Sequence, residues 1–539
     1  MSGIKSISLT EWLLLVLFAG VEGFSVKMFE DLLRRLCLAC VALLLGQWLR
    51  RRREHFRFFQ RLGIPGPKPN LLFGSLHEIY LKNALWAVND WHRKFGPVVG
   101  LFYGKDPVLL VSDPAVLRKV LKDESDKFSS RSAIFNVPGV PNSVSCLRGD
   151  DWHRLRDKLT PLYGKDNIKK LSPVITSCID DLVANVRREC SEGGSEREFD
   201  VSRLFEAFSL DVICRVGLGL KYPLQRQGEP HPLLRFVRDN LKPPLKLRQI
   251  FCISLPVLTS IVKRLYEFVL TWSKGSFQKR LTPIEKLRGD CVQRVQQIRA
   301  SERQTSVDLL EAMLRGDAPV SETEAVDSGI LNILTGYETT SSALCFITNM
   351  LIRHPNVQDR LRQELMSVVG SSADSTNTTH QQRNPEPDAL ANCRYLDAVI
   401  KETLRMYPPV YMFTTRISNE ATELQENLRI PAGLTLMAST REMHYNEDIW
   451  PEPQRFDPDR FMSDTTEHLD DIWLPFGLGP RNCLGREFAF QVIRMTLSRL
   501  VLNYRIDTFE YLPQSRVELV AHPGLLKLKN GLRCRASPL

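Results

Sequence analysis

The stretch Phe476-Gly477-Leu478-Gly479-Pro480-Arg481-Asn482-Cys483-Leu484-Gly485 decides the fold, because it presents one cysteine on a glycine-rich loop just before a helical pattern that begins at Arg486. Three glycines allow a tight turn and a close approach to a bound group. Backbone N–H groups at the helix start and the charge of Arg481 favour a thiolate over a thiol. Such a cysteine is suited to act as a soft ligand of a metal ion. A buried, unreactive cysteine is the alternative.

The spacing Phe-x-x-Gly-x-Arg-x-Cys-x-Gly resembles the haem-binding signature of the cytochrome P-450 superfamily at every fixed position. The resemblance implies a mainly α fold with a smaller β-rich region near the N-terminal end. It also implies haem b (iron protoporphyrin IX) as the cofactor, with Cys483 as the axial ligand of the iron. Phe476 would pack near the sulfur, and Arg481 would contact a haem propionate. A thiolate ligand promotes cleavage of the O–O bond.

The composition is that of an ordinary globular protein, with 539 residues, 43% of them hydrophobic and 25% charged. Twelve cysteines show no paired spacing, which favours free thiols in a reducing compartment. The net charge is +10, but the basic residues are dispersed among predicted helices, so we expect no nucleic-acid partner. The charge suits a basic docking face for an acidic reductase, with candidates Arg154, Lys158, Lys165 and Arg486.

Residues 1–53 have the composition of a membrane anchor region. Trp12–Phe24 is one apolar run, and Leu36–Leu49 is a second that is followed by four arginines, Arg50–Arg53. The second run approaches the length of a spanning helix when Leu32 and Leu33 are included. The arginines place that end in the cytosol by the positive-inside rule. We therefore expect the endoplasmic reticulum membrane, with the catalytic domain on its cytosolic face, as in microsomal members of the family.

Two questions about the anchor stay open at this point. A cleavable signal peptide is the alternative to an anchor, although no small-residue cleavage site precedes the basic block. Trp12–Phe24 either spans the membrane as a second segment or lies in its interface.

Residues 54–70 are basic and proline-rich and predict a hinge. Leu62–Pro69 contains three prolines and two glycines, which predict a semi-rigid, non-helical connector. It resembles the hinge of microsomal family members. Residues 71–539 would then form the haem-binding catalytic domain. Inside it, residues 371–387 are polar and without periodicity, which predicts a disordered surface insertion.

Several shorter patterns predict secondary structure around the candidate site. Helical spacing covers Ala84–Phe95, and two strands are predicted over Val98–Tyr103 and Pro107–Val111. Pro408 and Pro409 end a helix over Leu396–Met406, and we predict a strand over Val410–Thr415.

Trp152 and Arg156 lie four residues apart in a predicted helix, so their side chains share one face. A tryptophan packed on an arginine stem would explain the pair without chemistry. The pattern Trp-x-x-x-Arg also resembles the C-helix motif of the family, which implies that both residues contact a haem propionate. By the same resemblance, Arg131 and Arg416 occupy the positions of further propionate contacts.

Ala325–Leu351 predicts a long apolar helix that is interrupted by Thr335-Gly336-Tyr337-Glu338-Thr339-Thr340. Such polar residues are costly in a buried helix, and a local bend without chemistry is the alternative. The stretch resembles the family motif Ala-Gly-x-(Asp/Glu)-Thr-Thr, which implies that Glu338 and Thr339 relay protons to bound dioxygen. Thr335 replaces the usual alanine, and its effect on oxygen binding or substrate fit is open.

Glu402 and Arg405 lie three residues apart on a predicted helix and can form an ion pair. They resemble the Glu-x-x-Arg motif of the family, in which a third arginine completes a buried triad behind the haem. Downstream, Pro451–Phe456 and Asp459–Phe461 each offer a further arginine, and the resemblance assigns Arg455 as the third member. This triad would serve folding and not catalysis.

The motifs occur in the order of the family and cover nearly the whole chain. Leu62–Pro67 and Gly336–Ser342 resemble most the subfamily-three clan of animal microsomal enzymes, which includes xenobiotic oxidisers and thromboxane synthase. The resemblance implies a monooxygenase that inserts one atom of dioxygen into a lipophilic small molecule. Electrons would come from NADPH through a separate flavoprotein reductase, with cytochrome b5 as a second candidate partner.

Two other functions are compatible with the same motifs. A haem-thiolate isomerase would rearrange a lipid peroxide without dioxygen or reductase, but the retained Glu338 and Thr339 speak against it. A catalytically silent haem protein would be expected to have lost a motif residue, and none is lost.

Overall fold

The fold is described from a computed structural model of the chain, which divides into two compact units, Met1–Arg61 and Leu62–Leu539. The described residues are 26–132, 139–193, 198–226, 228–241, 250, 253–255, 264, 283–302, 308–372, 385–412, 414–463, 467–509, 517–522 and 524–539. The predicted run Trp12–Phe24 lies outside these ranges.

The first unit contains the helices α2 (Val26–His55) and α3 (Phe58–Arg61). Within α2, the segment Glu30–His55 is long and apolar enough to span a membrane, with a mean hydropathy of 1.6. The first part of the predicted hinge region, residues 54–61, is therefore mostly helical. The helix continues because Arg50–His55 contains no proline or glycine to end it.

The proline-rich part of the predicted hinge, residues 62–70, forms no helix and belongs to the second unit. The N–H of Gly100 donates to the carbonyl of Pro65 at 2.8 Å. A Cβ atom on Gly66 would lie 1.9 Å from the carbonyl oxygen of Gly100, so only glycine allows this approach. This segment is thus tied to the first strand of the catalytic unit.

The β-rich region is built from distant parts of the chain. Its main sheet has the order β1-β2-β7-β4, with β1 (Val98–Tyr103) and β2 (Asp106–Val111) antiparallel, as the sequence predicts. β2 pairs in parallel with β7 (Thr435–Ala438), and β7 pairs antiparallel with β4 (Thr415–Ile417). In a three-stranded sheet, β11 (Arg533–Pro538) lies between β3 (Phe199–Asp200) and β8 (Tyr504–Asp507). Two two-stranded sheets pair β5 (Thr422–Gln425) with β6 (Leu428–Ile430) and β9 (Leu519–His522) with β10 (Leu525–Leu528).

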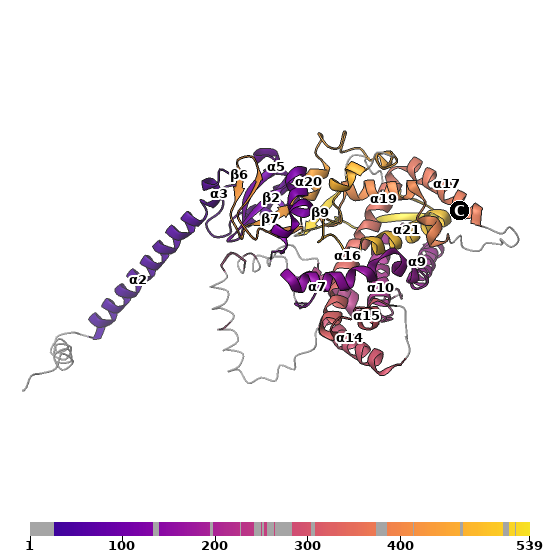
Figure 1. The fold of residues 1–539 in the computed structure, drawn as a ribbon, viewed down its shortest axis with the longest axis horizontal. Helices are drawn as coiled ribbons and strands as arrows, with labels where there is room; N and C mark the ends of the chain where they lie inside the picture. The colour runs from indigo at the N-terminus through magenta and orange to yellow at the C-terminus, as the bar shows by residue number, and fades with distance from the viewer. Residues whose placement is uncertain are drawn as a thin grey trace, which may run out of the picture. The chain divides into compact units, whose positions relative to one another are not determined.

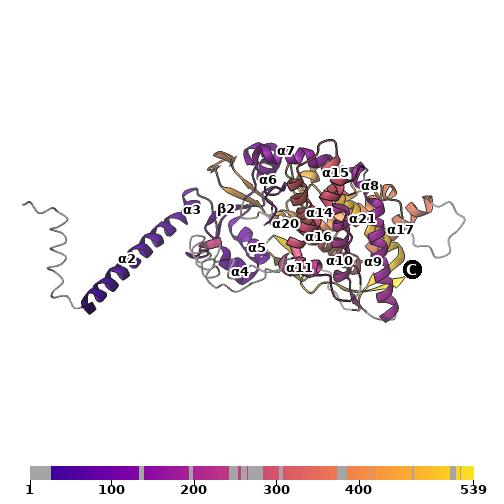
Figure 2. The same cartoon turned by 90° about the horizontal axis from the view of Figure 1, so that it is seen from below.

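The central helix of the second unit is α16 (Glu322–Arg353), which confirms the predicted long helix (Figure 1). It starts with a capping box between Ser321 and Glu324. It packs against α10 (Val201–Leu218), α19 (Arg394–Met406) and α21 (Arg486–Asn503) (Figure 2). A Cβ atom on Gly329 would lie 2.4 Å from Leu218 Cδ2, so this glycine allows α10 to approach closely.

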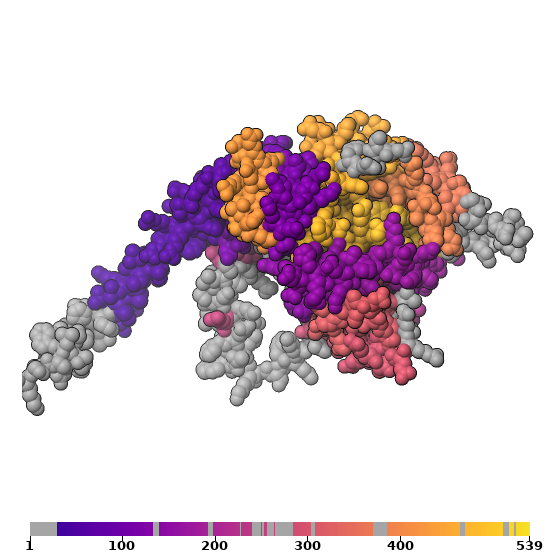
Figure 3. All heavy atoms as spheres, in the orientation of Figure 1, coloured from indigo at the N-terminus to yellow at the C-terminus, as the bar shows by residue number. Residues whose placement is uncertain are grey.

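The other helical elements surround this core. On one face, α21 lies beside α8 and α9 (Figure 3). The remaining helices are α4 (Leu76–Lys82), α5 (Ala84–Phe95), α6 (Pro114–Arg118), α7 (Gly149–Leu159), α8 (Lys165–Lys170), α9 (Ser172–Gly193), α11 (Pro232–Leu241), α14 (Pro283–Ala300), α15 (Leu309–Arg315), α17 (Pro355–Ser372), α18 (Pro387–Leu390) and α20 (Thr440–His444). Short π- or 3-10-helical turns are η1 (Lys119–Asp123), η2 (Ser125–Phe128), η4 (Thr160–Tyr163), η5 (Pro458–Phe461) and η6 (Glu467–Asp471).

Two predicted boundaries differ from the structure. The predicted strand Val410–Thr415 is wrong, because only Thr415 belongs to β4 and Val410 forms an isolated bridge with Leu525. Within this run, Val410 and Thr414 line the cavity described below. At the predicted insertion 371–387, α17 extends through Ser372 and α18 starts at Pro387, while residues 373–384 lie outside the described ranges.

A buried ion pair forms between two residues of α19. Arg405 donates from Nε to Glu402 at 2.7 Å and from Nη2 at 2.9 Å, and both side chains are fully buried. The third arginine at this site is Arg460, whose Nε lies 3.4 Å from Glu402. The assignment of Arg455 is therefore wrong, because its side chain is 63% exposed and pairs with Glu452 at 3.2 Å.

This network extends to the cysteine loop through His444. Arg405 Nη1 donates to the carbonyl of His444, and His444 Nδ1 lies 2.9 Å from the carbonyl of Arg405. Nε2 of the same ring accepts from the N–H of Leu474 at 2.9 Å. Burial, and then the charge of Arg405, lowers the pKa of His444 to about 3, so the ring is neutral and can accept that bond. The ion pair thus positions the start of the cysteine loop.

Replacing the third arginine should destabilise the fold, whereas replacing the one assigned from sequence should not. We expect Arg460→Ala to lower the free energy of unfolding by about 1–3 kcal/mol, because Glu402 stays buried with one cation fewer. Arg455→Ala should change it by less than about 0.5 kcal/mol. Denaturant unfolding of the two variants measures the difference. Equal effects of the two substitutions would contradict the assignment.

Candidate haem site

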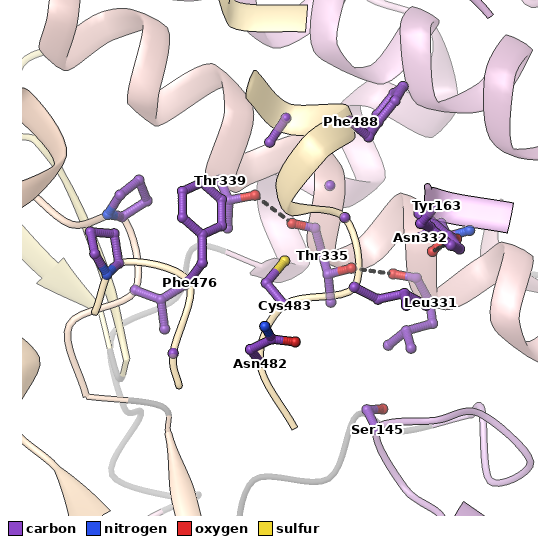
Figure 4. Close-up of a pocket in the computed structure, with 18 of the residues that line it drawn as sticks. Ser145, Tyr163, Leu331, Asn332, Thr335, Thr339, Phe476, Asn482, Cys483 and Phe488 are labelled. Atoms are coloured by element: carbon purple, nitrogen blue, oxygen red, sulfur yellow. Dashed lines mark hydrogen bonds between the residues drawn. The ribbon is translucent and has the colours of Figure 1, made fainter. Parts of the chain in front are cut away.

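The loop 476–485 holds Cys483 at the edge of a cavity that encloses about 280 Å³. Gly477 and Gly479 have φ angles of 73° and 71°, a region that favours glycine. The N–H of Cys483 donates to the carbonyl of Phe476 at 2.8 Å and closes the loop. Figure 4 shows that the sulfur points into the cavity. The sequence predicts this arrangement, and α21 begins at Arg486 as expected.

The loop is fixed from behind by tight packing. A Cβ atom on Gly479 would lie 1.7 Å from the carbonyl oxygen of Leu121 in η1, so the two backbones touch. The ring of Phe476 lies 5.9 Å from that of Trp473 and 5.6 Å from that of Phe490, measured between centroids. Phe476 also lines the cavity beside the cysteine, which agrees with its predicted position.

The thiol of Cys483 is exposed to the cavity but enclosed by the protein around it. Burial raises its pKa, whereas the backbone N–H of Gly485 and the charges of Arg156, Arg131 and Arg486 oppose that rise. Positive groups and a backbone N–H therefore surround the sulfur and favour its anionic form when a metal takes the place of the proton.

Across the cavity, α16 contributes the two threonines singled out in the sequence. Thr339 Oγ1 donates to the carbonyl of Thr335 at 2.7 Å, and Thr335 Oγ1 donates to the carbonyl of Leu331 at 2.8 Å (Figure 4). Both threonines line the same cavity as Cys483. α16 is continuous over Thr335–Thr340, so this polar stretch does not break the helix.

Glu338 does not follow Thr339 into the cavity. Its carboxylate is buried and forms an ion pair with Lys527 on β10. Among the described residues that line the cavity, α16 supplies Leu331, Asn332, Thr335, Gly336, Thr339, Thr340 and Ala343. The predicted acid–alcohol pair is therefore split, with the alcohol at the cavity and the acid one helix face away.

The predicted propionate contacts form a cluster of four arginines. Arg156 donates to the carbonyl of Asn482 at 3.1 Å, and Arg131 donates to the carbonyl of Arg481 at 3.1 Å. The guanidinium of Arg481 stacks 3.9 Å above the ring of Trp152. Arg416 is buried and donates to the carbonyl of Thr415 at 2.8 Å. The structure thus brings together all of the residues predicted for this role.

These four arginines carry positive charge that no carboxylate neutralises in the part of the chain that the structure describes. No described carboxylate forms a salt bridge with any of them, and Nε of Arg131 and both Nε and Nη1 of Arg481 are buried without a hydrogen-bond partner. Burial and repulsion from neighbouring arginines lower the pKa of Arg481 to about 9 and that of Arg416 well below its usual value. A ligand with two carboxylates beside the cysteine would satisfy these groups, and haem b carries two propionates.

Sequence reasoning missed several residues at the cavity. Tyr163 Oη donates to Oδ1 of Asn332 at 3.0 Å, and both residues line the cavity. Away from the cavity, the roles of Lys527 and Arg460 were also missed. The sequence contains a signal for Arg460, because Pro458-Asp459-Arg460-Phe461 repeats the pattern Pro453-Gln454-Arg455-Phe456. Nothing in the local sequence marks the other three.

Comparison with known proteins agrees with this geometry. The family model described as "Cytochrome P450" matches residues 64–531. The chain belongs to the cytochrome P450 family. Lithocholate 6-beta-hydroxylase of Mesocricetus auratus is 30% identical over 84% of this chain and 87% of its own length. Cytochrome P450 3A6 of Oryctolagus cuniculus is 30% identical, over 87% and 90%, and cytochrome P450 3A17 of Cavia porcellus is 31% identical, over 84% and 87%.

Membership of the cytochrome P450 family establishes the class of chemistry. The protein is a haem-thiolate monooxygenase with haem b as its cofactor and a cysteine thiolate as the iron ligand. Its similar relatives include several animal cytochromes of the 3A group. The thiol of Cys483 and the unneutralised arginine cluster fit this cofactor.

Neutralising one buried arginine should have opposite effects on the apoprotein and on haem binding. We expect Arg416→Met to stabilise the apoprotein by about 1–4 kcal/mol, because it removes an unpaired buried charge. The same change should raise the dissociation constant of haem by about tenfold, equivalent to about 1.4 kcal/mol. Denaturant unfolding of the apoprotein and haem titration measure the two quantities.

Arg429→Met, at an exposed position in β6, is the matched control and should change neither quantity. A destabilised Arg416→Met apoprotein with unchanged haem affinity would contradict the account.

Proposed function

We propose that the protein oxidises a lipophilic small molecule at the cavity between Cys483 and Thr339, with electrons delivered from NADPH by a separate flavoprotein reductase. The observation that carries the proposal is the placement of a thiol and a helical threonine hydroxyl on opposite walls of one cavity. When bound, haem supplies the chemistry that inserts one atom of dioxygen into the substrate. The protein residues hold the cofactor, shape the cavity and move protons.

Four arginines are proposed to hold the cofactor through its propionates, and one cysteine is proposed to hold it through its iron. Cys483 would ligate the iron. Arg481, Arg156, Arg131 and Arg416 would bind the propionates through charge-assisted hydrogen bonds, and Trp152 would support Arg481 by stacking. Donors for these bonds would include Nε of Arg131 and Nε and Nη1 of Arg481, which have no hydrogen-bond partner among the described residues.

Thr339 and Glu338 are proposed to act in sequence in proton delivery. The Thr339 hydroxyl donates to the Thr335 carbonyl, so it is oriented and has a lone pair available on the cavity side. Glu338 can supply protons to it only when the ion pair with Lys527 loosens. Lys527 is therefore a positioning residue for the proposed acid.

Apolar side chains dominate the rest of the cavity and favour a lipophilic substrate. Val144, Ile213, Leu331, Ala343 and Val410 are among the lining residues. An apolar cavity with few polar groups binds its guest mainly by excluding water. Because one relative is a lithocholate hydroxylase, we include lithocholate among the candidate substrates.

The partners and the location follow from charge and from α2. We propose that the reductase, and cytochrome b5 as a second donor, dock on the basic face near the cysteine loop. Arg154 and Lys165 are exposed and are candidates for this face. Arg154 also forms an ion pair with Glu324. The helix Glu30–His55 would anchor the protein in the endoplasmic reticulum membrane, and Arg50–Arg53 would place the catalytic unit on the cytosolic face.

The test is NADPH consumption by the membrane-bound protein, with and without added reductase, across lipophilic compounds that include lithocholate. We expect reductase-dependent consumption that a substrate stimulates, with formation of an oxygenated product. Thr339→Ala should preserve NADPH consumption but lower the oxygenated product per NADPH by about tenfold, because proton delivery to the cavity is impaired.

Lys527→Met separates the two roles proposed for the proton path. It should alter the product yield per NADPH while leaving the absorption spectrum of the haem unchanged. Absence of reductase-dependent turnover, together with rearrangement of an organic hydroperoxide by the purified protein, would overturn the proposal in favour of an isomerase.

A further inference from the structure

The loop 139–147 forms one wall of the cavity and is held at both ends. Val144 and Ser145 line the cavity, and Figure 4 labels Ser145. At one end, Arg481 Nη2 donates to the carbonyl of Leu147 at 3.1 Å, so the wall is tied to the cysteine loop. Between the ends, Ser143 Oγ donates to the carbonyl of Val140 at 2.8 Å and rigidifies the turn.

The other end is held by Asp327, in the second turn of α16. Its Oδ2 accepts from the backbone N–H of Asn142 at 2.9 Å and from Nδ2 of the same residue at 3.0 Å. Its Oδ1 accepts from Nη2 of Arg288, on α14, at 2.8 Å. Arg288 also donates to the carbonyl of Gly139. One carboxylate and one guanidinium thus join α16, α14 and the loop.

The burial of the Asp327 carboxylate explains why its contacts with Asn142 and Arg288 are strong. The side chain of Asp327 is 1% exposed, while that of Arg288 is 40% exposed. A buried carboxylate must be hydrogen-bonded, and here both of its oxygens are used. Bonds to an ionised acceptor are stronger than neutral ones, and separating the loop from α16 would leave the charge without these donors.

We infer that Asp327 is a positioning residue that latches the loop 139–147 against α16 and α14 and so restricts the passage of large ligands into and out of the cavity. Movement of Val144 and Ser145 away from the cavity requires the bonds to Asn142 to break. A small ligand does not need that movement, so the latch discriminates by size. The inference rests on the proposed function only in taking this cavity as the ligand site.

The experiment compares two ligands that bind the haem iron through an imidazole nitrogen but differ in size. Ketoconazole is bulky and imidazole is small, and stopped-flow absorbance of the haem follows both. We expect Asp327→Asn to speed the association and dissociation of ketoconazole by about tenfold, which corresponds to about 1.4 kcal/mol. Arg288→Gln should speed both by about threefold, because the backbone and side-chain bonds of Asn142 remain. Imidazole rates should stay within about twofold of wild type for both variants.

Glu322→Gln is the matched control, because it removes the same charge from the same helix. Glu322 pairs with Arg299 at 3.4 Å, and both side chains are more than half exposed. It should leave the ketoconazole rates unchanged. If Asp327→Asn does not take up haem, Arg288→Gln decides the question. Arg288 is 40% exposed, and Asp327 keeps its bonds to Asn142 in this variant.

Unchanged ketoconazole rates in Arg288→Gln and in a haem-loaded Asp327→Asn would overturn the inference. Equal acceleration of ketoconazole and imidazole would also overturn it, since general loosening of the fold would then be the cause. Ligand binding needs neither reductase nor turnover, so failure of the proposed electron source or substrate class would leave this result interpretable.

Discussion

Repulsion among buried guanidinium groups is the constraint on which this structure depends. Arg131, Arg156, Arg416 and Arg481 share one region, without a salt bridge to any described carboxylate. Burying such charges is costly unless an opposite charge is bound. In our proposal the haem propionates supply it, which would couple cofactor binding to folding at this site. Cys483 and the loop 139–147 are both attached to these arginines, which links the cofactor to the cavity wall.

The same site is supported from behind by a neutral histidine. The Glu402–Arg405 pair fixes His444, and His444 accepts from the loop that leads to Cys483. α16 crosses the opposite side of the cavity and carries Thr339 to it and Glu338 away from it. The proposed chemistry therefore depends on two supports, one for the sulfur and one for the proposed proton path. A buried ion pair and a neutral imidazole provide directional bonds that apolar packing does not.

Local patterns predicted the parts of this fold that depend on local physics. The glycines around Cys483 and the periodicity of Ala325–Leu351 gave the loop and α16, because backbone geometry and apolar spacing decide both. Arg455 and Arg460 both lie in a Pro-x-Arg-Phe pattern, five residues apart, and only packing selects between them. The partners Lys527 and Asn142 lie far along the chain from Glu338 and Asp327, so periodicity could not find them.

The most direct test of the central claim is the absorption spectrum of the reduced, carbon-monoxide-bound protein, recorded for wild type and for Cys483→His. The account predicts that wild type shows the long-wavelength Soret band of a thiolate-ligated haem and that Cys483→His retains haem but loses this band. A thiolate-type band that persists in Cys483→His would contradict the account, because another residue would then ligate the iron.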